Sequence, residues 1–179
     1  MYGVIVTISA LFQAIFGGVG QALQPLVSAN YGADGYGRVK EFWKMVAVTT
    51  SILCLLFCCT GLLLPTQIVK LFIKATPEVL ATAPGICRIY FLTFIPLGFS
   101  VLSIYYLQSI RRDRTATLIA VSRSIAISGL FILVLPVILD IWGLWIASPL
   151  AEFLTAVFSS IYVTIVNKRD LRISGGNKP

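Results

Sequence analysis

Two rows of polar side chains run through otherwise apolar segments, and they offer the most chemistry in this sequence. The first row has members three or four residues apart: Gln13, Gly17, Gln21, Gln24 and Ser28. The second row has the same spacing: Ser148, Glu152, Thr155, Ser159 and Tyr162. This spacing places each row on one face of an α-helix. Because polar groups are costly in hydrocarbon, we expect both faces to meet protein or water.

Two interpretations of these rows stay open. Small and hydroxyl side chains favour helix packing in lipid, so the Ser and Thr positions are explained by contacts between helices. Glu152 requires more, because a carboxylate inside a membrane span costs roughly 2.5–3.5 kcal/mol on insertion scales. It must be neutral, paired or facing water, which predicts either a proton-linked cavity role or a structural pairing.

Two arginines, Arg88 and Arg123, also lie in apolar segments. We expect Arg123 to extend its side chain to the cytoplasmic interface rather than to pair with Glu152, and Arg88 to extend outward in the same way. Both are candidates for structural roles in pairing the helices. Pro25 is a third such candidate, because a proline can kink a membrane helix.

The composition identifies an integral membrane protein. Of the 179 residues, 58% are hydrophobic and only 12% are charged, whereas soluble domains carry about 25% charged residues. The net charge of +7 is typical of loops beside membrane spans, so we expect a lipid bilayer as partner and no nucleic acid. The chain has no histidine, and its four cysteines lie in apolar runs as small hydrophobes. We therefore expect no metal site.

Five segments are apolar over the roughly 20 residues that a membrane span requires. The expected spans are approximately residues 4–29, 42–64, 77–109, 115–139 and 142–166. Residues 66–76 alternate apolar side chains with lysines and are expected to form a turn of helix at the membrane interface. The predicted fold is an all-α membrane bundle of five helices in a single domain, residues 1–179, with a frayed cytoplasmic tail over residues 167–179.

Basic residues gather at alternate ends of these spans. One side holds 11 of the 14 Lys and Arg: Arg38, Lys40, Lys44, Arg111, Arg112, Arg114, Arg123, Lys168, Arg169, Arg172 and Lys178. The positive-inside rule then predicts an outer N-terminus and a cytoplasmic C-terminus in the cell membrane. Aromatic residues at the span ends, Tyr105 and Tyr106 among them, are expected to anchor at the interfaces. Nothing precedes the first span to hold it outside, so we expect a piece of a longer protein or a truncated reading frame.

Several short motifs follow one another along nearly the whole chain. They are QALQPLVS at residues 21–28, NYGA at 30–33, PE at 77–78, Arg123 in the next span and SPLAE at 148–152. In this order and spacing they resemble the multidrug and toxic compound extrusion (MATE) family, and the NYGA form is similar to that of its carboxy-terminal lobe.

The resemblance implies a transporter of twelve helices in two six-helix lobes around a central cavity. This chain would supply five helices of the carboxy-terminal lobe, and the missing amino-terminal lobe would be its partner. The sequence departs from the family in two places. The third span has no acidic residue where one branch has a cation ligand, and residues 109–112 replace the usual small residues and glycine after Gln108.

The leading hypothesis is therefore a partial secondary transporter that exports amphipathic, often cationic, drugs by H⁺ or Na⁺ antiport, with no other cofactor. The candidate cavity-lining or lobe-stabilising residues are Gln21, Gln24, Asn30 and Glu152. One alternative is a lobe of a lipid-linked saccharide flippase, which would require more cations inside its spans than are present. The other is a non-functional truncated remnant. An enzyme is not expected, because no nucleophile–base set or metal-ligand cluster is visible.

Overall fold

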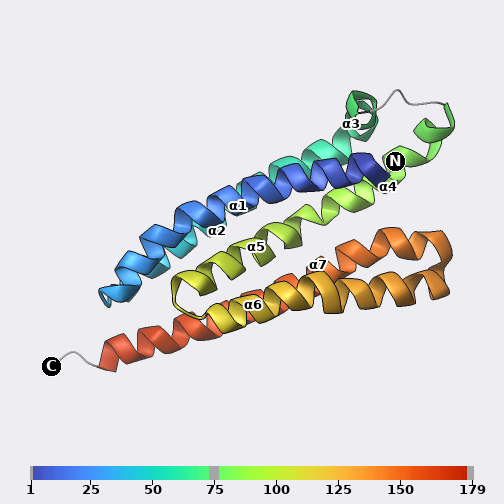
Figure 1. The fold of residues 1–179 in the computed structure, drawn as a ribbon. Coiled ribbons are helices and arrows are strands. Elements are labelled where there is room, and N and C mark those ends of the chain that lie inside the picture. The colour runs from blue at the N-terminus through green and yellow to red at the C-terminus, as the bar shows by residue number, and fades with distance from the viewer. Residues whose placement is uncertain (1, 73–76, 177–179) are drawn as a thin grey trace.

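The chain folds into long helices whose axes are roughly aligned, with neighbouring helices running in the same or in opposite directions. The computed structural model describes residues 2–72 and 77–176, which are almost entirely helical and contain no strand. The described residues include five helical stretches long and apolar enough to cross a membrane: Val6–Gly32, Tyr36–Leu63, Ala83–Ser109, Asp113–Asp140 and Trp142–Arg169. Figure 1 shows the two chain ends at opposite ends of the bundle, as an odd number of passes requires. The predicted five-helix membrane bundle is confirmed.

The first two spans form a tight hairpin. Helix α1 (Tyr2–Gly32) is followed by α2 (Tyr36–Leu63). Asp34 has a φ of 55°, in the left-handed region where aspartate is one of the tolerated residues. The backbone N–H of Gly35 donates to the Asn30 carbonyl over 2.8 Å and closes the turn. Pro65 then begins the short helix α3 (Pro65–Phe72). It agrees with the predicted turn of helix over residues 66–72, and residues 73–76 of that prediction lie outside the described residues.

The third span is two helices rather than the single long helix that we predicted. Helix α4 (Pro77–Leu92) ends one residue before Thr93, and α5 (Phe94–Ser109) begins one residue after it. Pro96 explains the break, because it has no N–H for the carbonyl of Leu92 and its ring crowds the preceding turn. The N–H of Thr93 bonds instead to the Tyr90 carbonyl, over 3.0 Å.

The last two spans also form a hairpin. The fourth contains α6 (Asp113–Val121), a π-helical turn (Ser122–Ile127) and the first part of α7 (Ser128–Gly176). Within α7 the chain reverses at Leu139 and Asp140, where the φ of Asp140 is 49°. The remainder of α7 is the fifth span.

The helix of the fifth span continues past the membrane segment. The prediction of a frayed tail is wrong for residues 167–176, which are helical, and residues 177–179 lie outside the described part. At the start of this extension, the side-chain oxygen of Asn167 accepts a hydrogen bond from the hydroxyl of Tyr106 on α5, which ties this part of the helix to the bundle.

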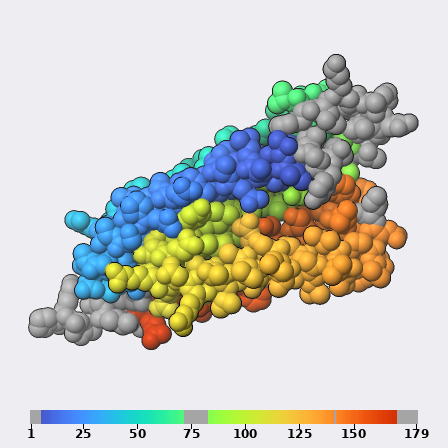
Figure 2. Space-filling model, in the orientation of Figure 1, coloured from blue at the N-terminus to red at the C-terminus, as the bar shows by residue number. Residues whose placement is uncertain are grey.

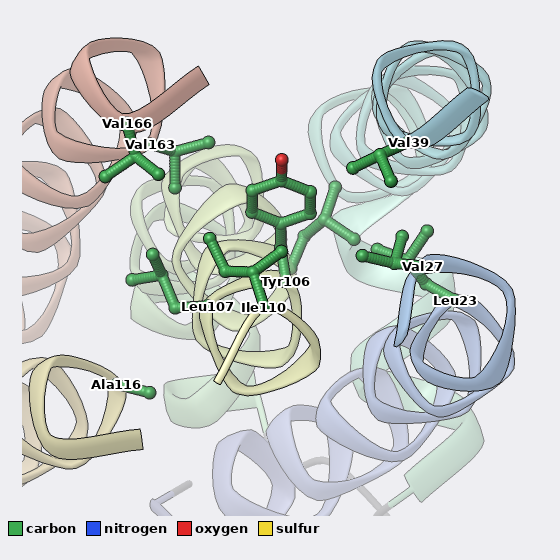
Figure 3. Packing of buried hydrophobic residues seen from close by; sticks show 10 residues of the cluster. Leu23, Val27, Val39, Tyr106, Leu107, Ile110, Ala116, Val163 and Val166 are labelled. Atoms are coloured by element: carbon green, nitrogen blue, oxygen red, sulfur yellow. The ribbon is translucent and has the colours of Figure 1, made fainter. Parts of the chain in front are cut away.

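Helix α5 is the centre of the bundle. Ten of its 16 residues are buried, so it has no face reserved for lipid. Figure 3 shows Tyr106 and Leu107 of α5 between Val27 of α1 on one side and Val163 of α7 on the other. Tyr106 is only 1% exposed, which corrects its prediction as an interface anchor: its ring packs in the core and on Trp43, at 4.6 Å between ring centres.

Close helix contacts depend on glycine at several points of this core. At Gly61 of α2 an added Cβ would stand 2.4 Å from Phe91 Cβ and 1.9 Å from Phe91 Cγ. Phe91 is buried and its Cβ is fixed by the backbone, so it cannot simply rotate away. Membrane helices commonly use small residues in this way to approach one another.

We predict that Gly61→Ala destabilises the protein by about 1–3 kcal/mol through overpacking. Gly37→Ala on the same helix is the matched control, because no heavy atom lies within 4 Å of the added Cβ. Thermal unfolding in detergent, followed by fluorescence-detected size exclusion, measures both. Equal midpoints for the two variants would show that the α2–α4 contact is not close.

Candidate functional site

The first polar row meets α5 in a cluster of uncharged polar side chains. Gln24 Nε2 on α1 donates a hydrogen bond to Gln108 Oε1 on α5, over 3.0 Å. Gln21 on α1 and Tyr105 on α5 lie one turn earlier on their helices, and both lie beside Gly17. A Cβ added to Gly17 would stand 3.6 Å from the Tyr105 hydroxyl and 4.0 Å from Nε2 of Gln21. We call these four side chains, Gln21, Gln24, Tyr105 and Gln108, the amide cluster.

Glycines on α1 give the cluster its room. At Gly20 an added Cβ would stand 2.2 Å from Cδ2 of the Tyr105 ring, so the ring lies directly on the backbone of α1. Pro25 follows in the same helix, and its missing N–H leaves the Gln21 carbonyl without its usual helix partner. The cluster therefore stands where the two helices come close and α1 has a free backbone acceptor.

Much of this polar row is open to the surroundings of the chain. Gln13, Gln21 and Ser28 are exposed, and Gln24 is half-buried. Figure 2 shows α1 and α5 side by side on one face of the molecule. An amide moved from water into pure hydrocarbon without a hydrogen bond costs about 4–8 kcal/mol. This face is therefore expected to meet water or further protein rather than lipid.

Asn30 has a different position. Its side-chain Nδ2 donates to the Leu26 carbonyl of the same helix over 2.8 Å, and its own carbonyl accepts the hydrogen bond from Gly35. It closes the turn between α1 and α2, and the amide cluster does not include it.

The second polar row contains a buried ion pair. Arg123 Nε in the π-helical turn lies 3.2 Å from Glu152 Oε1 in the fifth span, and the two side chains are only 13% and 12% exposed. The expectation that Arg123 extends to the interface instead of pairing is therefore wrong. The second carboxylate oxygen, Oε2, is buried and has no hydrogen-bond partner among the described residues.

The hydroxyls beside Glu152 are satisfied within their own helix. Thr155 donates to the Ala151 carbonyl over 2.9 Å, and Ser159 donates to the Ala156 carbonyl over 3.2 Å. Both residues are buried. The helix-packing interpretation therefore fits these positions, and the pairing interpretation fits Glu152.

The two groups of polar residues lie on opposite sides of α5. The amide cluster joins α1 to α5, whereas the ion pair joins the fourth span to the fifth, and Figure 1 places α5 between α1 and these spans. Arg88 on α4 is exposed, and no ion pair with it is found among the described residues.

Sequence reasoning missed Gln108 and Tyr105 as members of a site. One signal was available, since Gln108 is the only amide of the third span and Gln24 needed a polar partner at the same depth. Four buried hydroxyls of the core were also missed: Thr50, Thr93, Ser100 and Ser103. They have no partner among the described residues, and no sequence pattern distinguishes them from packing residues.

Comparisons with known proteins place this arrangement in a family. The sequence profile named MatE matches residues 1–134. The chain belongs to the MatE family. A search of curated protein sequences finds no match.

Two solved structures share the fold of this MatE chain. One is described as the outward-facing conformation of a multidrug resistance MATE family transporter of the MOP superfamily, with a TM-score of 0.86 and 13% identity over 96% of this chain. The other is a MOP superfamily transporter from Pyrococcus furiosus, whose reverse pocket polarity is said to suggest a different function, with a TM-score of 0.85 and 13% identity over 94% of this chain. The chain spans 39% and 38% of their lengths.

The buried ion pair yields a prediction about stability. Arg123→Gln should destabilise the protein by about 3–5 kcal/mol, because it leaves the Glu152 carboxylate buried without its partner. Adding Glu152→Gln should restore part of the loss, since no charge then stays unpaired. Thermal unfolding in detergent checks both variants.

Arg88→Gln is the matched control for the ion pair, because it removes an exposed arginine from a neighbouring span. It should have little effect on the unfolding midpoint. If Arg123→Gln were as mild as this control, the pair would contribute nothing to holding the two spans together.

Proposed function

We propose that this MatE chain is part of the carboxy-terminal lobe, five of its six helices, of a secondary transporter that exports amphipathic, often cationic, organic molecules by alternating access. Its partner would be an amino-terminal lobe across a shared cavity, and the driving ion would be H⁺ or Na⁺, with no other cofactor and no enzymatic step. The protein would lie in the cell membrane with an outer N-terminus and a cytoplasmic C-terminus.

The partly exposed amide cluster carries this proposal: Gln21 is exposed, and Gln24, Tyr105 and Gln108 are half-buried. Its four side chains bear no formal charge, and they can donate and accept hydrogen bonds in many orientations. A wall of this kind holds amphipathic molecules without selecting one geometry, and it does not repel cations. Gln21 and Gln24 would line the cavity together with Tyr105 and Gln108. Asn30 would shape the turn that ends the cavity helix.

Glu152 supports the lobe rather than the coupling step in this proposal. Its carboxylate is engaged by Arg123, and the third span, residues 83–109, has no acidic residue. The carboxylate that binds the coupling ion would then belong to the partner lobe. Pro25, Arg88 and Arg123 would have structural roles.

A flippase for lipid-linked saccharides is the second candidate, and the positions of the arginines disfavour it. Such a protein needs cationic groups that line its cavity to hold a pyrophosphate. Arg123 is occupied by Glu152, and the amide cluster contains no cation. The third candidate is a remnant without activity. A reading frame upstream of Met1 that encodes further helices would favour the transporter, and a stop codon there without a partner gene would favour the remnant.

Efflux measurements test the proposed cavity. The double substitution Gln21→Leu with Gln24→Leu should lower the efflux of a fluorescent organic cation at least tenfold, because the wall loses its hydrogen-bonding groups but keeps its size. The assay uses cells that express the chain with its partner lobe, and immunoblotting confirms equal amounts in the membrane.

Gln67→Leu is the matched control, since it makes the same chemical change on an exposed residue of α3. It should leave efflux unchanged. Normal efflux by the double variant at normal expression would remove the amide cluster from the transport path.

A further inference from the structure

The π-helical turn stands where the buried ion pair forms. It covers Ser122–Ile127, so Arg123 lies inside it. A π turn uses hydrogen bonds from residue i to i+5 and therefore contains one residue more than an α turn. Ser128 Oγ donates to the Arg123 carbonyl over 2.6 Å, which is also a contact across five residues. The hydroxyl of Ser128 thus supports the π turn at Arg123, the residue that pairs with Glu152.

The fourth span buries few of its side chains. Between residues 113 and 140, all of which are described, Ala116 alone is buried. At the start of the span, Arg112 Nη1 and Thr115 Oγ1 each lie 3.4 Å from the Tyr162 hydroxyl. These are long contacts between flexible side chains.

The hairpin end of the span is held more firmly. A Cβ added at Gly143 would stand 2.3 Å from the Leu135 carbonyl oxygen, so the two backbones lie against each other. A backbone contact of this kind cannot adjust without moving the helices. The half before the π turn is held through side chains instead: Ala116 lies in the core cluster with Leu107 and Val163, and Arg112 and Thr115 contact Tyr162.

A change from π to α would turn that half by one residue. Each residue of an α-helix contributes a rotation of about 100° and a rise of about 1.5 Å. If the turn became α-helical while the hairpin end stayed in place, residues 113–123 would rotate by this amount. Arg123 would move away from Glu152. Before the turn, each residue's place would be taken by the residue that follows it in the sequence.

We propose that the π turn is a register switch: the π form presents Arg123 to Glu152, and the α form releases the first half of the fourth span from the fifth. The ion pair holds the switch in the π form, and neutralising either partner drives it to the α form. This proposal does not rest on the transport activity proposed above.

Cross-linking between two cysteines tests the switch. Ile119 and Phe158 line the same hollow of about 270 Å³ between the fourth and fifth spans. In a chain whose native cysteines are replaced by alanine, Ile119→Cys with Phe158→Cys should be joined by a short bis-methanethiosulfonate reagent in intact membranes, with each thiolate displacing a methanesulfinate leaving group. Ala120→Cys with Phe158→Cys should react at least fivefold less. Mass spectrometry of the joined peptides measures both yields.

Adding Glu152→Gln should reverse the preference, so that position 120 is joined in place of position 119. Arg123→Gln should do the same, and it is the second variant if the first does not accumulate. Glu41→Gln on α2, which neutralises an exposed carboxylate outside this contact, should leave the preference for position 119 unchanged. An unchanged preference for position 119 in the variants that break the pair would overturn the proposal.

Deleting Ala126 provides the opposite test, because it removes one residue from the turn while Arg123 and Glu152 stay. The shortened turn would be α-helical with the earlier residues in their original places. Position 119 should then be joined to position 158 whether residue 152 is Glu or Gln. Loss of the 119–158 cross-link in the deletion variant with Glu152 would contradict a one-residue switch.

Discussion

Hydrocarbon provides no hydrogen bonds, and this constraint governs the whole chain. Every polar group at membrane depth must find a partner in the protein or face water. The structure meets much of this demand around one central helix, α5, whose residues are mostly buried, although the hydroxyls of Ser100 and Ser103 on that helix have no partner among the described residues. Polar side chains on one side of α5 gather with those of α1, and on the other side Arg123 neutralises Glu152. What stays exposed and polar, above all Gln21, then marks the face that lipid does not cover.

The same constraint divides the bundle into a firm part and a loose part. The first three spans approach closely through glycines such as Gly20 and Gly61, which lie against aromatic rings. The fourth span has one buried residue, Ala116, in the core cluster with Leu107 and Val163. Its other attachments are a hydroxyl contact, an ion pair and a close hairpin. A membrane helix held by a few polar contacts can move at lower cost than one packed on all sides, since lipid replaces protein around its apolar face.

The fold was predictable from the sequence because length and hydropathy determine how many times a chain can cross a bilayer. The motif around Gln24 also indicated the family correctly, and it lies within residues 1–134, which the family profile matches. The errors concern tertiary partners. Sequence spacing shows which face Arg123 occupies in a regular helix, but the π turn changes that face. The break at Thr93 follows from Pro96, yet proline often passes through membrane helices without ending them. Tyrosine is a residue type common at membrane interfaces, and Tyr106 is buried only because α5 lies at the centre of the bundle.

The most direct test of the account is the water accessibility of the α1 face. The variants Gln21→Cys, Gln24→Cys and Leu26→Cys, in a chain whose native cysteines are replaced by alanine, would be expressed with the partner lobe in cell membranes. A membrane-impermeant, thiol-reactive reagent should label positions 21 and 24 and leave position 26 unlabelled. Leu26 lies on the same helix and is also exposed, but it is apolar and is therefore expected to face lipid. Positions 21 and 24 as unreactive as position 26 would contradict the central claim that this face meets water.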